Sequence, residues 1–403
     1  MAEQSTPVAV TAPASVKFMK SFWEQVGPGR LAWDFSRPNQ VLAPGDGSLK
    51  VEAGVLKGLR LKEAGLAGEL LVDGAKGLDF LVLKGNKLTS ATFKNLPKLQ
   101  GFVIADEHLT SLTLGGGLGP LRSEAAVEAP RLSRLTVLGR NRLTELYIRR
   151  SSRLEDISPI RRLENLGALQ IKSELLSDLR PLKGMSFCFC LNLESPVLSD
   201  LKPLGKLEYV SELLLTGDGI TDLKPLAKLK DWLYILYINS NNLTDLAPLA
   251  KLKKMSILEL FGDALADLNP LAGLDLLTTL VLEGRNLKNL RPLGRLKRIR
   301  NICLTGDGIT DLKPLAKLES CLNRLEVKSK NLTDLAPLAK LKKLRRLKLS
   351  GEALADLGPL AGLTSLKDLA LEGRNLKNLT PLAKIEAGLS TYRVNDQDMK
   401  ARP

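Results

Sequence analysis

A motif that returns every 22 or 23 residues over more than half of the chain constrains its fold more than any other feature. One such repeat is too short to bury its own leucines, whereas stacked repeats bury them together in a continuous core. The sequence therefore predicts a stacked array of repeats. The same apolar position is marked in eleven successive repeats by Leu154, Leu176, Leu198, Ile220, Leu243, Leu265, Leu287, Ile309, Leu332, Leu354 and Leu376.

The residues within one repeat predict a short strand followed by a tight helical turn. Leu347 and Leu349 alternate with other residues, as in a strand with one buried face. The next leucines return at every third residue over 354–363, which suits a 3₁₀-helix. Asp356 can accept hydrogen bonds from the first amides of that helix, and Pro359 fixes φ where no amide donor is needed. The matching aspartates in other repeats are Asp178, Asp200, Asp222, Asp245, Asp267, Asp311 and Asp334.

The repeat motif L-x-x-L-x-L-x(4)-[IL]-x-D-[IL]-x-P-L-x-x-L resembles the 22-residue class of the leucine-rich-repeat superfamily, which includes internalins and phosphatase-regulating relatives. The resemblance is close over residues 151–385 and loose over residues 51–150. It implies an α/β solenoid, namely a curved right-handed leucine-rich-repeat horseshoe. Such a horseshoe has a parallel β-sheet on its concave face and short 3₁₀ or irregular segments on its convex face.

The sequence departs from the family in the loop that follows each strand. The asparagine that is usual there is present at Asn86 and Asn241. We therefore expect the backbone hydrogen-bond ladder of this loop to be weaker or satisfied differently. The other repeats carry Asp218, Asp263, Arg285, Asp307, Lys330, Glu352 and Arg374 at this position.

The chain upstream of the regular repeats has shorter and less even spacing. We expect strands at 56–61, 78–88, 99–104, 109–114, 132–138 and 143–148, as degenerate repeats of the same solenoid. An exposed solenoid end needs a cap, and aromatic residues concentrate within 17–50. The predicted organisation is a flexible N-terminal tail (1–16), an N-terminal cap (17–50), degenerate repeats (51–150), regular repeats (151–385), and a C-terminal cap and tail (386–403).

A block of four repeats that begins at Gly217 recurs from Gly306, at an offset of 89 residues. The segment GDGITDLKPLAKL is identical in the two copies, and so are NLTDLAPLAKLKK and EGRNLKNL. The differences concentrate in the strands, where KDWLYILYINSN in the first copy corresponds to ESCLNRLEVKSK in the second. This pattern indicates an internal duplication in which the scaffold was kept and the strand surfaces diverged.

In this architecture, the residues that flank the buried strand leucines point onto the concave face. They form an apolar stripe in the first copy, whereas the second copy is charged in the same rows. Exposed apolar stripes with polar surroundings usually mark interaction sites. We therefore expect a protein partner there; the alternatives are a second copy or a terminal segment of this chain, or no role. The predicted partner-binding residues are Leu214, Ile235, Tyr237, Ile257, Glu259, Phe261, Val281 and Glu283.

The chain carries a formal net charge of +15, and part of this excess lies where successive turns lead into their strands. Stacking would align these residues as a basic edge that attracts nucleic acid, an anionic membrane or an acidic protein. The alternative is a solvated flank that keeps a leucine-rich protein soluble. Aromatic residues for base stacking are not interleaved with this edge. The edge comprises Lys253, Lys254, Arg295, Lys297, Arg298, Arg300, Lys342, Lys343 and Arg345.

Rare residue types argue against catalysis and metal binding. His108 is the single histidine, which excludes a histidine-clustered metal site and argues against triad hydrolysis. The cysteines, Cys188, Cys190, Cys303 and Cys321, are too few for a disulfide framework and suit a reducing compartment. We therefore expect no catalytic residues, no metal and no cofactor. The sequence predicts a non-enzymatic, cytoplasmic scaffold for protein–protein interaction, with a homo-oligomeric structural subunit or a nucleic-acid or membrane ligand as the alternatives.

Overall fold

The computed structural model describes residues 41–42, 47–52, 55–64, 66–119, 125–139, 141–185 and 187–399. The predicted tail at 1–16, most of the predicted cap at 17–50 and the last four residues lie outside this description. The chain divides into two compact units, the first being Met1–Leu198 with Lys206–Val210 and the second Ser199–Gly205 with Ser211–Pro403. No helix among the described residues is both long and apolar enough to cross a membrane.

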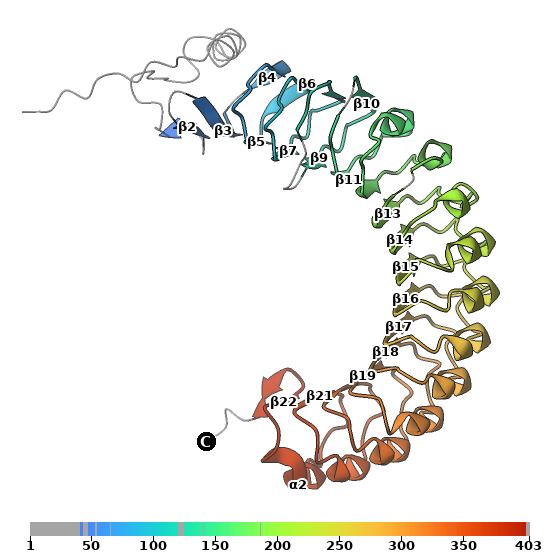
Figure 1. Cartoon of the computed structure of the whole chain (residues 1–403). Helices are drawn as coiled ribbons and strands as arrows, with labels where there is room; N and C mark the ends of the chain where they lie inside the picture. The colour runs from blue at the N-terminus through green and yellow to red at the C-terminus, as the bar shows by residue number, and fades with distance from the viewer. Residues whose placement is uncertain are drawn as a thin grey trace, which may run out of the picture. The chain divides into compact units, whose positions relative to one another are not determined.

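The second unit is built from one strand and one 3₁₀-helix per repeat, with the strands on its concave side and the helices on its convex side (Figure 1). Its strands are β14 (Glu212–Thr216), β15 (Ile235–Asn239), β16 (Ile257–Phe261), β17 (Thr279–Glu283), β18 (Asn301–Thr305), β19 (Arg324–Lys328), β20 (Arg346–Ser350), β21 (Asp368–Glu372) and β22 (Thr391–Val394). These strands pair in sequence order, each parallel to the next. β23 (Gln397–Asp398) adds an antiparallel pair to β22.

The 3₁₀-helices of the second unit are η4 (Lys224–Leu229), η5 (Ala247–Lys251), η6 (Asn269–Gly273), η7 (Arg291–Arg295), η8 (Lys313–Leu318), η9 (Ala336–Lys340), η10 (Gly358–Gly362) and η11 (Thr380–Leu382). A short helix, α2 (Ala383–Glu386), follows the last of them, and η3 (Leu204–Lys206) spans the boundary between the units in sequence. η4 and η8 have six residues and the helices between them have five, which accounts for the two repeats of 23 residues.

The repeat leucines form the core, as the sequence predicts. Leu347, Leu349, Leu354, Leu360 and Leu363 are all at most 2% exposed. The predicted aspartate caps are also confirmed, because Asp356 Oδ1 accepts a hydrogen bond of 2.8 Å from the first amide of η10. Equivalent bonds open the neighbouring helices of the second unit.

The loop that follows each strand satisfies its backbone without the usual asparagine. Asn241, which has the usual residue type, is exposed. The amide that follows each of β14 to β20 donates to the carbonyl that ends the next strand, as from Gly262 to Glu283 at 2.9 Å, and the amide after β21, of Gly373, donates to Asn395 Oδ1 at 2.8 Å. Asparagines one position later add a second ladder, in which Asn331 Nδ2 donates to the Asp307 carbonyl at 2.8 Å. The backbone groups of this loop are therefore hydrogen-bonded to other partners rather than left unpaired.

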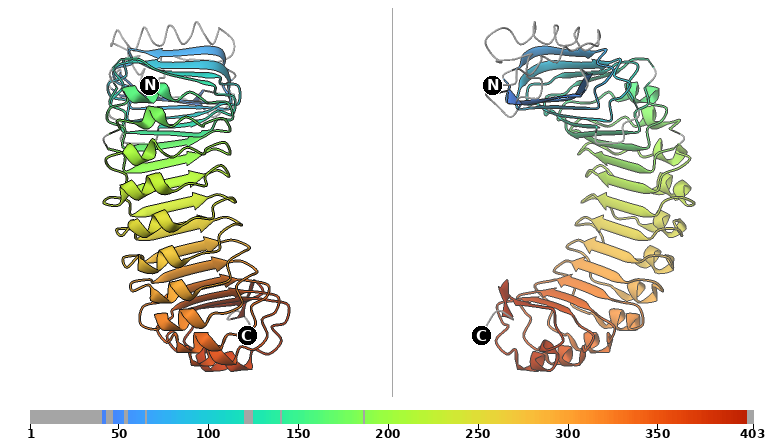
Figure 2. Two further views of the ribbon diagram at one scale, coloured as in Figure 1. Left: turned by 90° about the vertical axis from the view of Figure 1, so that its right-hand side faces the viewer. Right: turned by 60° about the vertical axis from the view of Figure 1, so that its left-hand side comes forward.

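The first unit has two parallel sheets whose strands stack as rungs (Figure 2). One sheet continues the single-strand pattern with β3 (Val55–Lys62), β5 (Phe80–Lys84), β7 (Gly101–Ala105), β9 (Ala125–Glu128), β11 (Glu145–Arg150), β12 (Ala168–Lys172) and β13 (Cys190–Glu194), preceded by the antiparallel β1 (Val41–Leu42) and β2 (Gly47–Glu52). The other contains β4 (Ala67–Asp73), β6 (Lys87–Lys94), β8 (Ser111–Leu114) and β10 (Arg134–Val137). The 3₁₀-helices of the first unit are η1 (Ser158–Arg162) and η2 (Arg180–Leu182).

The prediction of a single strand over 78–88 is wrong, because part of this segment belongs to the second sheet. The segment 78–88 is not one strand, because it contains β5 and the first residues of β6. Gly85, at φ 63°, turns the chain between them. The adjacent Asn86 is buried; its side chain accepts a hydrogen bond from the Ala64 amide and donates to the Leu61 carbonyl. Asn86 therefore does fill the loop position that the family reserves for asparagine.

Candidate protein-binding surface

The concave face of the second unit presents its outward-facing side chains in rows that run across the strands. The pairing register places Leu214 beside Tyr237, Tyr237 beside Glu259, and Glu259 beside Val281. Because neighbouring strands lie about 4.8 Å apart, side chains in one row touch. Each row therefore forms a continuous strip of surface.

The residues predicted to bind a partner lie together on β14–β17. The rings of Tyr237 and Phe261 have centroids 5.0 Å apart and planes inclined at 35°. Glu259 lies beside Tyr237 in the middle row, and Glu283 is exposed at the end of β17. We define the apolar patch as Leu214, Ile235, Tyr237, Ile257, Phe261 and Val281, all of which are partly exposed.

The second copy carries charged side chains in the corresponding rows, and they neutralise one another. Lys348 Nζ lies 3.2 Å from Glu372 Oε1 and 3.8 Å from Glu326 Oε1. The hydrogen bond to Glu372 raises the pKa of Lys348. Arg346 Nε lies 2.8 Å from Asp368 Oδ2. The two copies thus place an apolar and a charge-paired surface on the same scaffold.

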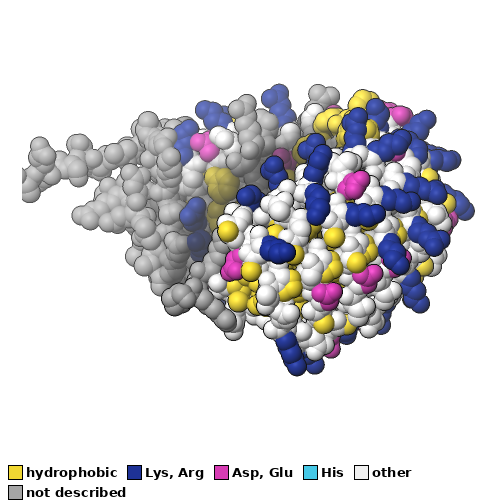
Figure 3. All heavy atoms as spheres, turned by 90° about the horizontal axis from the view of Figure 1, so that it is seen from below, with side chains coloured by type: hydrophobic (Ala, Val, Ile, Leu, Met, Phe, Trp, Pro, Cys, Tyr) yellow, Lys and Arg dark blue, Asp and Glu magenta, His cyan; other side chains and the backbone are white. Residues whose placement is uncertain are grey.

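The residues of the predicted basic edge are all exposed, and the structure places them between a 3₁₀-helix and the next strand, or at the end of η7 for Arg295. We call this side of the sheet the strand-start edge. Four lysines there have local partners: Lys297 Nζ is 2.7 Å from Asp275, Lys253 Nζ and Lys342 Nζ donate to carbonyls of the following repeat at 2.9 Å, and Lys343 Nζ donates to the Ser320 carbonyl at 3.2 Å. The face shown in Figure 3 carries many projecting Lys and Arg side chains with acidic groups between them.

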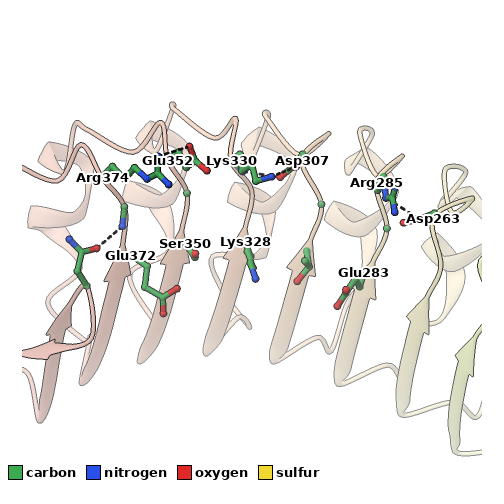
Figure 4. Close-up of a pocket in the computed structure, with 16 residues that line it drawn as sticks. Asp263, Glu283, Arg285, Asp307, Lys328, Lys330, Ser350, Glu352, Glu372 and Arg374 are labelled. Carbon is green, nitrogen blue, oxygen red and sulfur yellow. Dashed lines mark hydrogen bonds and ion pairs between the residues drawn. The ribbon is translucent and has the colours of Figure 1, made fainter.

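The opposite side of the sheet, which we call the strand-end edge, carries alternating charges in a hollow of about 640 Å³ (Figure 4). Arg285 lies 3.0 Å from Asp263, Lys330 lies 3.5 Å from Asp307, and Arg374 lies 4.0 Å from Glu352. These charges are paired between adjacent repeats, and the lining as a whole holds five acidic and four basic residues, so the hollow has only a small excess of one sign to attract a charged ligand. They occupy the loop position where the family has asparagine.

Two exposed aromatic residues beside the apolar patch were not among the predicted site residues. Trp232 is 48% exposed and Tyr234 is 38% exposed, and both precede β15 at the strand-start edge. Their places in the second copy hold Cys321 and Asn323. A comparison of the loop residues of the two copies, in addition to the strand residues, identifies them.

We expect Cys303 of the concave face to react slowly with iodoacetamide in the folded protein. Burial raises the pKa of its thiol to about 11. At pH 8 only about one molecule in a thousand then carries the reactive thiolate, so alkylation should be roughly 100-fold slower than in the unfolded chain. The rate should increase about tenfold per pH unit below pH 11. Mass spectrometry of the Cys303 peptide measures both rates, and equal rates in folded and urea-unfolded protein would contradict the prediction.

No group of three or more histidine, cysteine or acidic side chains in the described part of the chain is arranged to hold a metal ion. In the first unit, Cys188 is buried, whereas Cys190, two residues later, is partly exposed. Burial raises the pKa of Cys188 to about 12, as expected for a core thiol rather than a metal ligand.

No protein-family model matches this chain, and no curated protein is similar to it in sequence. Solved structures do match. An internalin, InlF, from Listeria monocytogenes is 26% identical with a TM-score of 0.51, over 72% of this chain and 87% of that one. The functional domain of InlJ from Listeria monocytogenes is 19% identical with a TM-score of 0.46, over 82% of this chain and 71% of that one.

The repeat, its parallel sheet with one strand per repeat and the 3₁₀-helices behind it define a leucine-rich-repeat solenoid. Within that class the chain is similar in structure to an internalin. Proteins of this fold generally serve as interaction scaffolds and are typically not enzymes.

Proposed function

We propose that this protein is a non-enzymatic scaffold that binds a protein partner on the concave face of its second unit, at the apolar patch. The observation that carries the proposal is the contrast between the duplicated copies. The same scaffold exposes Tyr237 and Phe261 in the first copy, where the second copy has Glu326 and Ser350. The core does not require aromatic residues at these positions, since the second copy folds without them. Their presence is explained by recognition.

The chemistry of the patch suits a protein ligand. Tyrosine and phenylalanine contribute a large contact area at a low entropic cost, and interface energy concentrates in such residues. The backbone beneath the patch is held by strand pairing on both sides, so binding needs little reorganisation. Glu259 lies inside the patch, between Tyr237 and Val281, and Glu283 lies at its margin; these two carboxylates supply polar contacts that orient a ligand on the apolar surface.

The proposal predicts that the double variant Tyr237→Glu/Phe261→Glu loses its partner. Two buried carboxylates at an apolar interface should lower affinity at least about 100-fold, because each would be desolvated without a counter-charge. The measurement is a pull-down from source-cell lysate at low and high salt, followed by titration of the protein that wild type retains. Circular dichroism of each variant confirms that it folds.

The duplication supplies a matched control. Ser350→Glu introduces the same side chain at the second-copy equivalent of Phe261, so it should retain the partner. If all three proteins retain the same material and salt removes it from each, the basic edge carries the binding and the patch does not. If wild type instead doubles its mass with concentration in light scattering and the double variant does not, the patch binds a second copy of the chain.

A further inference from the structure

The two copies also differ along the strand-start edge, in the residue that immediately precedes each strand. In the first copy this row is uncharged and hydroxyl-bearing: Ser211, Tyr234, Ser256 and Thr278. In the second copy the same four places hold Arg300, Asn323, Arg345 and Lys367. Successive members of the second row are tied by backbone hydrogen bonds of 2.7–2.8 Å. We call these four residues the basic row.

Two arginines of this row have no ion-pair partner among the described residues, namely Arg300 and Arg345. They contrast with the strand-end edge, where the cations at Arg285, Lys330 and Arg374 each have an acidic neighbour. A guanidinium offers several donors in one plane and pairs with carboxylates in a bidentate manner. The basic row therefore has donors to offer to an outside ligand.

The basic row borders a hollow of about 610 Å³ between β17 and β20. Arg324, Arg345 and Arg346 line it together with the amide side chains of Asn301 and Asn323. Cys303 and Val281, the latter a member of the apolar patch, line the same hollow. In the first copy, the places of Arg324, Arg345 and Arg346 are taken by Ile235, Ser256 and Ile257. The cationic character of the hollow is thus specific to the second copy.

We propose that this hollow and the basic row bind an acidic segment of the partner polypeptide, whose aspartates or glutamates pair with Arg300 and Arg345 while an apolar part of the same partner covers the apolar patch. This inference deepens the proposed function and rests on it. From β15 to β20 there are five strand spacings, or about 24 Å, which an extended segment spans with about seven residues. The partner is therefore expected to carry an apolar cluster and an acidic cluster separated by about that length.

The chemistry of the hollow favours a polypeptide over a nucleic acid. The residues that line the hollow include the apolar side chain of Val281 and the protonated thiol of Cys303. None of its lining residues is aromatic, so a base would find no ring on which to stack. Glu326 also lines it, held by Arg324 at 3.5 Å, and would repel a continuous phosphate backbone. Separate carboxylates on a flexible segment can occupy the arginines without approaching that glutamate.

The test uses the full chain and a labelled synthetic peptide in which four glutamates are joined by a seven-residue Gly/Ser spacer to a Leu-Trp-Leu-Leu cluster. Fluorescence anisotropy measures its affinity, with a glutamine version of the peptide and a single-stranded oligothymidylate of similar length as comparison probes. We expect the acidic peptide to bind best. The double variant Arg300→Gln/Arg345→Gln should lower its affinity about tenfold, because two exposed charge pairs are lost. Lys313→Gln, which removes an exposed cation from η8, is the matched control and should leave the affinity unchanged.

Two half-peptides separate the outcomes. If the arginines bind an acidic segment but the apolar patch binds no partner, the glutamate half binds with the arginine dependence and Tyr237→Glu/Phe261→Glu leaves the whole peptide unaffected; the proposed function then fails. If the inference is wrong and the proposed function is right, the apolar half binds alone and the arginine variant has no effect. Equal binding of the glutamate and glutamine peptides, tighter binding of the oligothymidylate, or no binding of any peptide overturns the inference.

Discussion

Replacing Leu282 with alanine is expected to destabilise the second unit by about 3–5 kcal/mol. Leu282 lies in β17 with a fully buried side chain, in register between Leu260 and Leu304 of the neighbouring strands. Alanine would remove apolar contacts with both neighbouring repeats and leave a cavity, since the backbone is held by the ladder on each side. Urea unfolding followed by circular dichroism measures the loss.

The adjacent residue provides the control for this prediction. Val281 belongs to the same strand but faces the concave surface and is partly exposed, so Val281→Ala should cost less than about 1 kcal/mol. Hydrogen exchange should show the Leu282→Ala loss concentrated in peptides from β16 to β18, because each repeat contacts mainly its neighbours. Equal losses in the two variants would contradict the buried column of leucines as the source of stability.

The second large effect is expected from Gly284→Ala. A Cβ atom at residue 284 would lie 2.4 Å from the carbonyl oxygen of Gly262 in the preceding repeat. That oxygen is backbone and cannot move aside without disturbing the strand pairing, so the substitution should cost about 2–3 kcal/mol. The melting temperature of the variant measures the effect.

Gly273→Ala is the control for Gly284→Ala. Its new Cβ would meet, from the rest of the described chain, Lys253 Nζ at 2.9 Å, which is the end of a flexible side chain. We expect little change in the melting temperature for this variant. A Gly284→Ala protein as stable as Gly273→Ala would show that the repeats can separate locally at no cost.

Most strands, 3₁₀-helices and caps of the second unit can be predicted from sequence periodicity, because every repeat buries its leucines in the same way. The alternation at Leu347 and Leu349, the three-residue spacing that follows and the cap at Asp356 each appear as predicted. Every one of these features is local, so a window of one repeat contains all the information needed. The hydrogen bonds of the loop at Asn241 do not follow from one repeat, because they depend on the neighbouring repeat, where Asp218 accepts from the Asn241 amide at 2.9 Å.

The second sheet of the first unit could not be predicted in the same way. Its strands alternate apolar and polar residues as the first sheet does, so the pattern alone does not tell which sheet a strand joins. The turn at Gly85 depends on a positive φ angle. Glycine and asparagine also occur outside turns, so the residues at 85 and 86 do not by themselves predict a turn. The expected site residues follow from the alternation of buried and outward-facing positions along each strand. The pairing of Lys348 with two glutamates depends in addition on the register of three strands, which the sequence does not give.

The repeated block also gives the molecule a means to change its length. Thr216–Gly217 and Thr305–Gly306 are the same dipeptide, and both glycine amides donate to the end of the next strand at 2.9 Å. A third block spliced in before Gly306 would therefore meet its neighbours through junctions that the chain already contains. Each insertion would extend the sheet by four strands, or about 19 Å. The reach of the concave surface is thus adjustable in fixed increments, independently of which side chains line it.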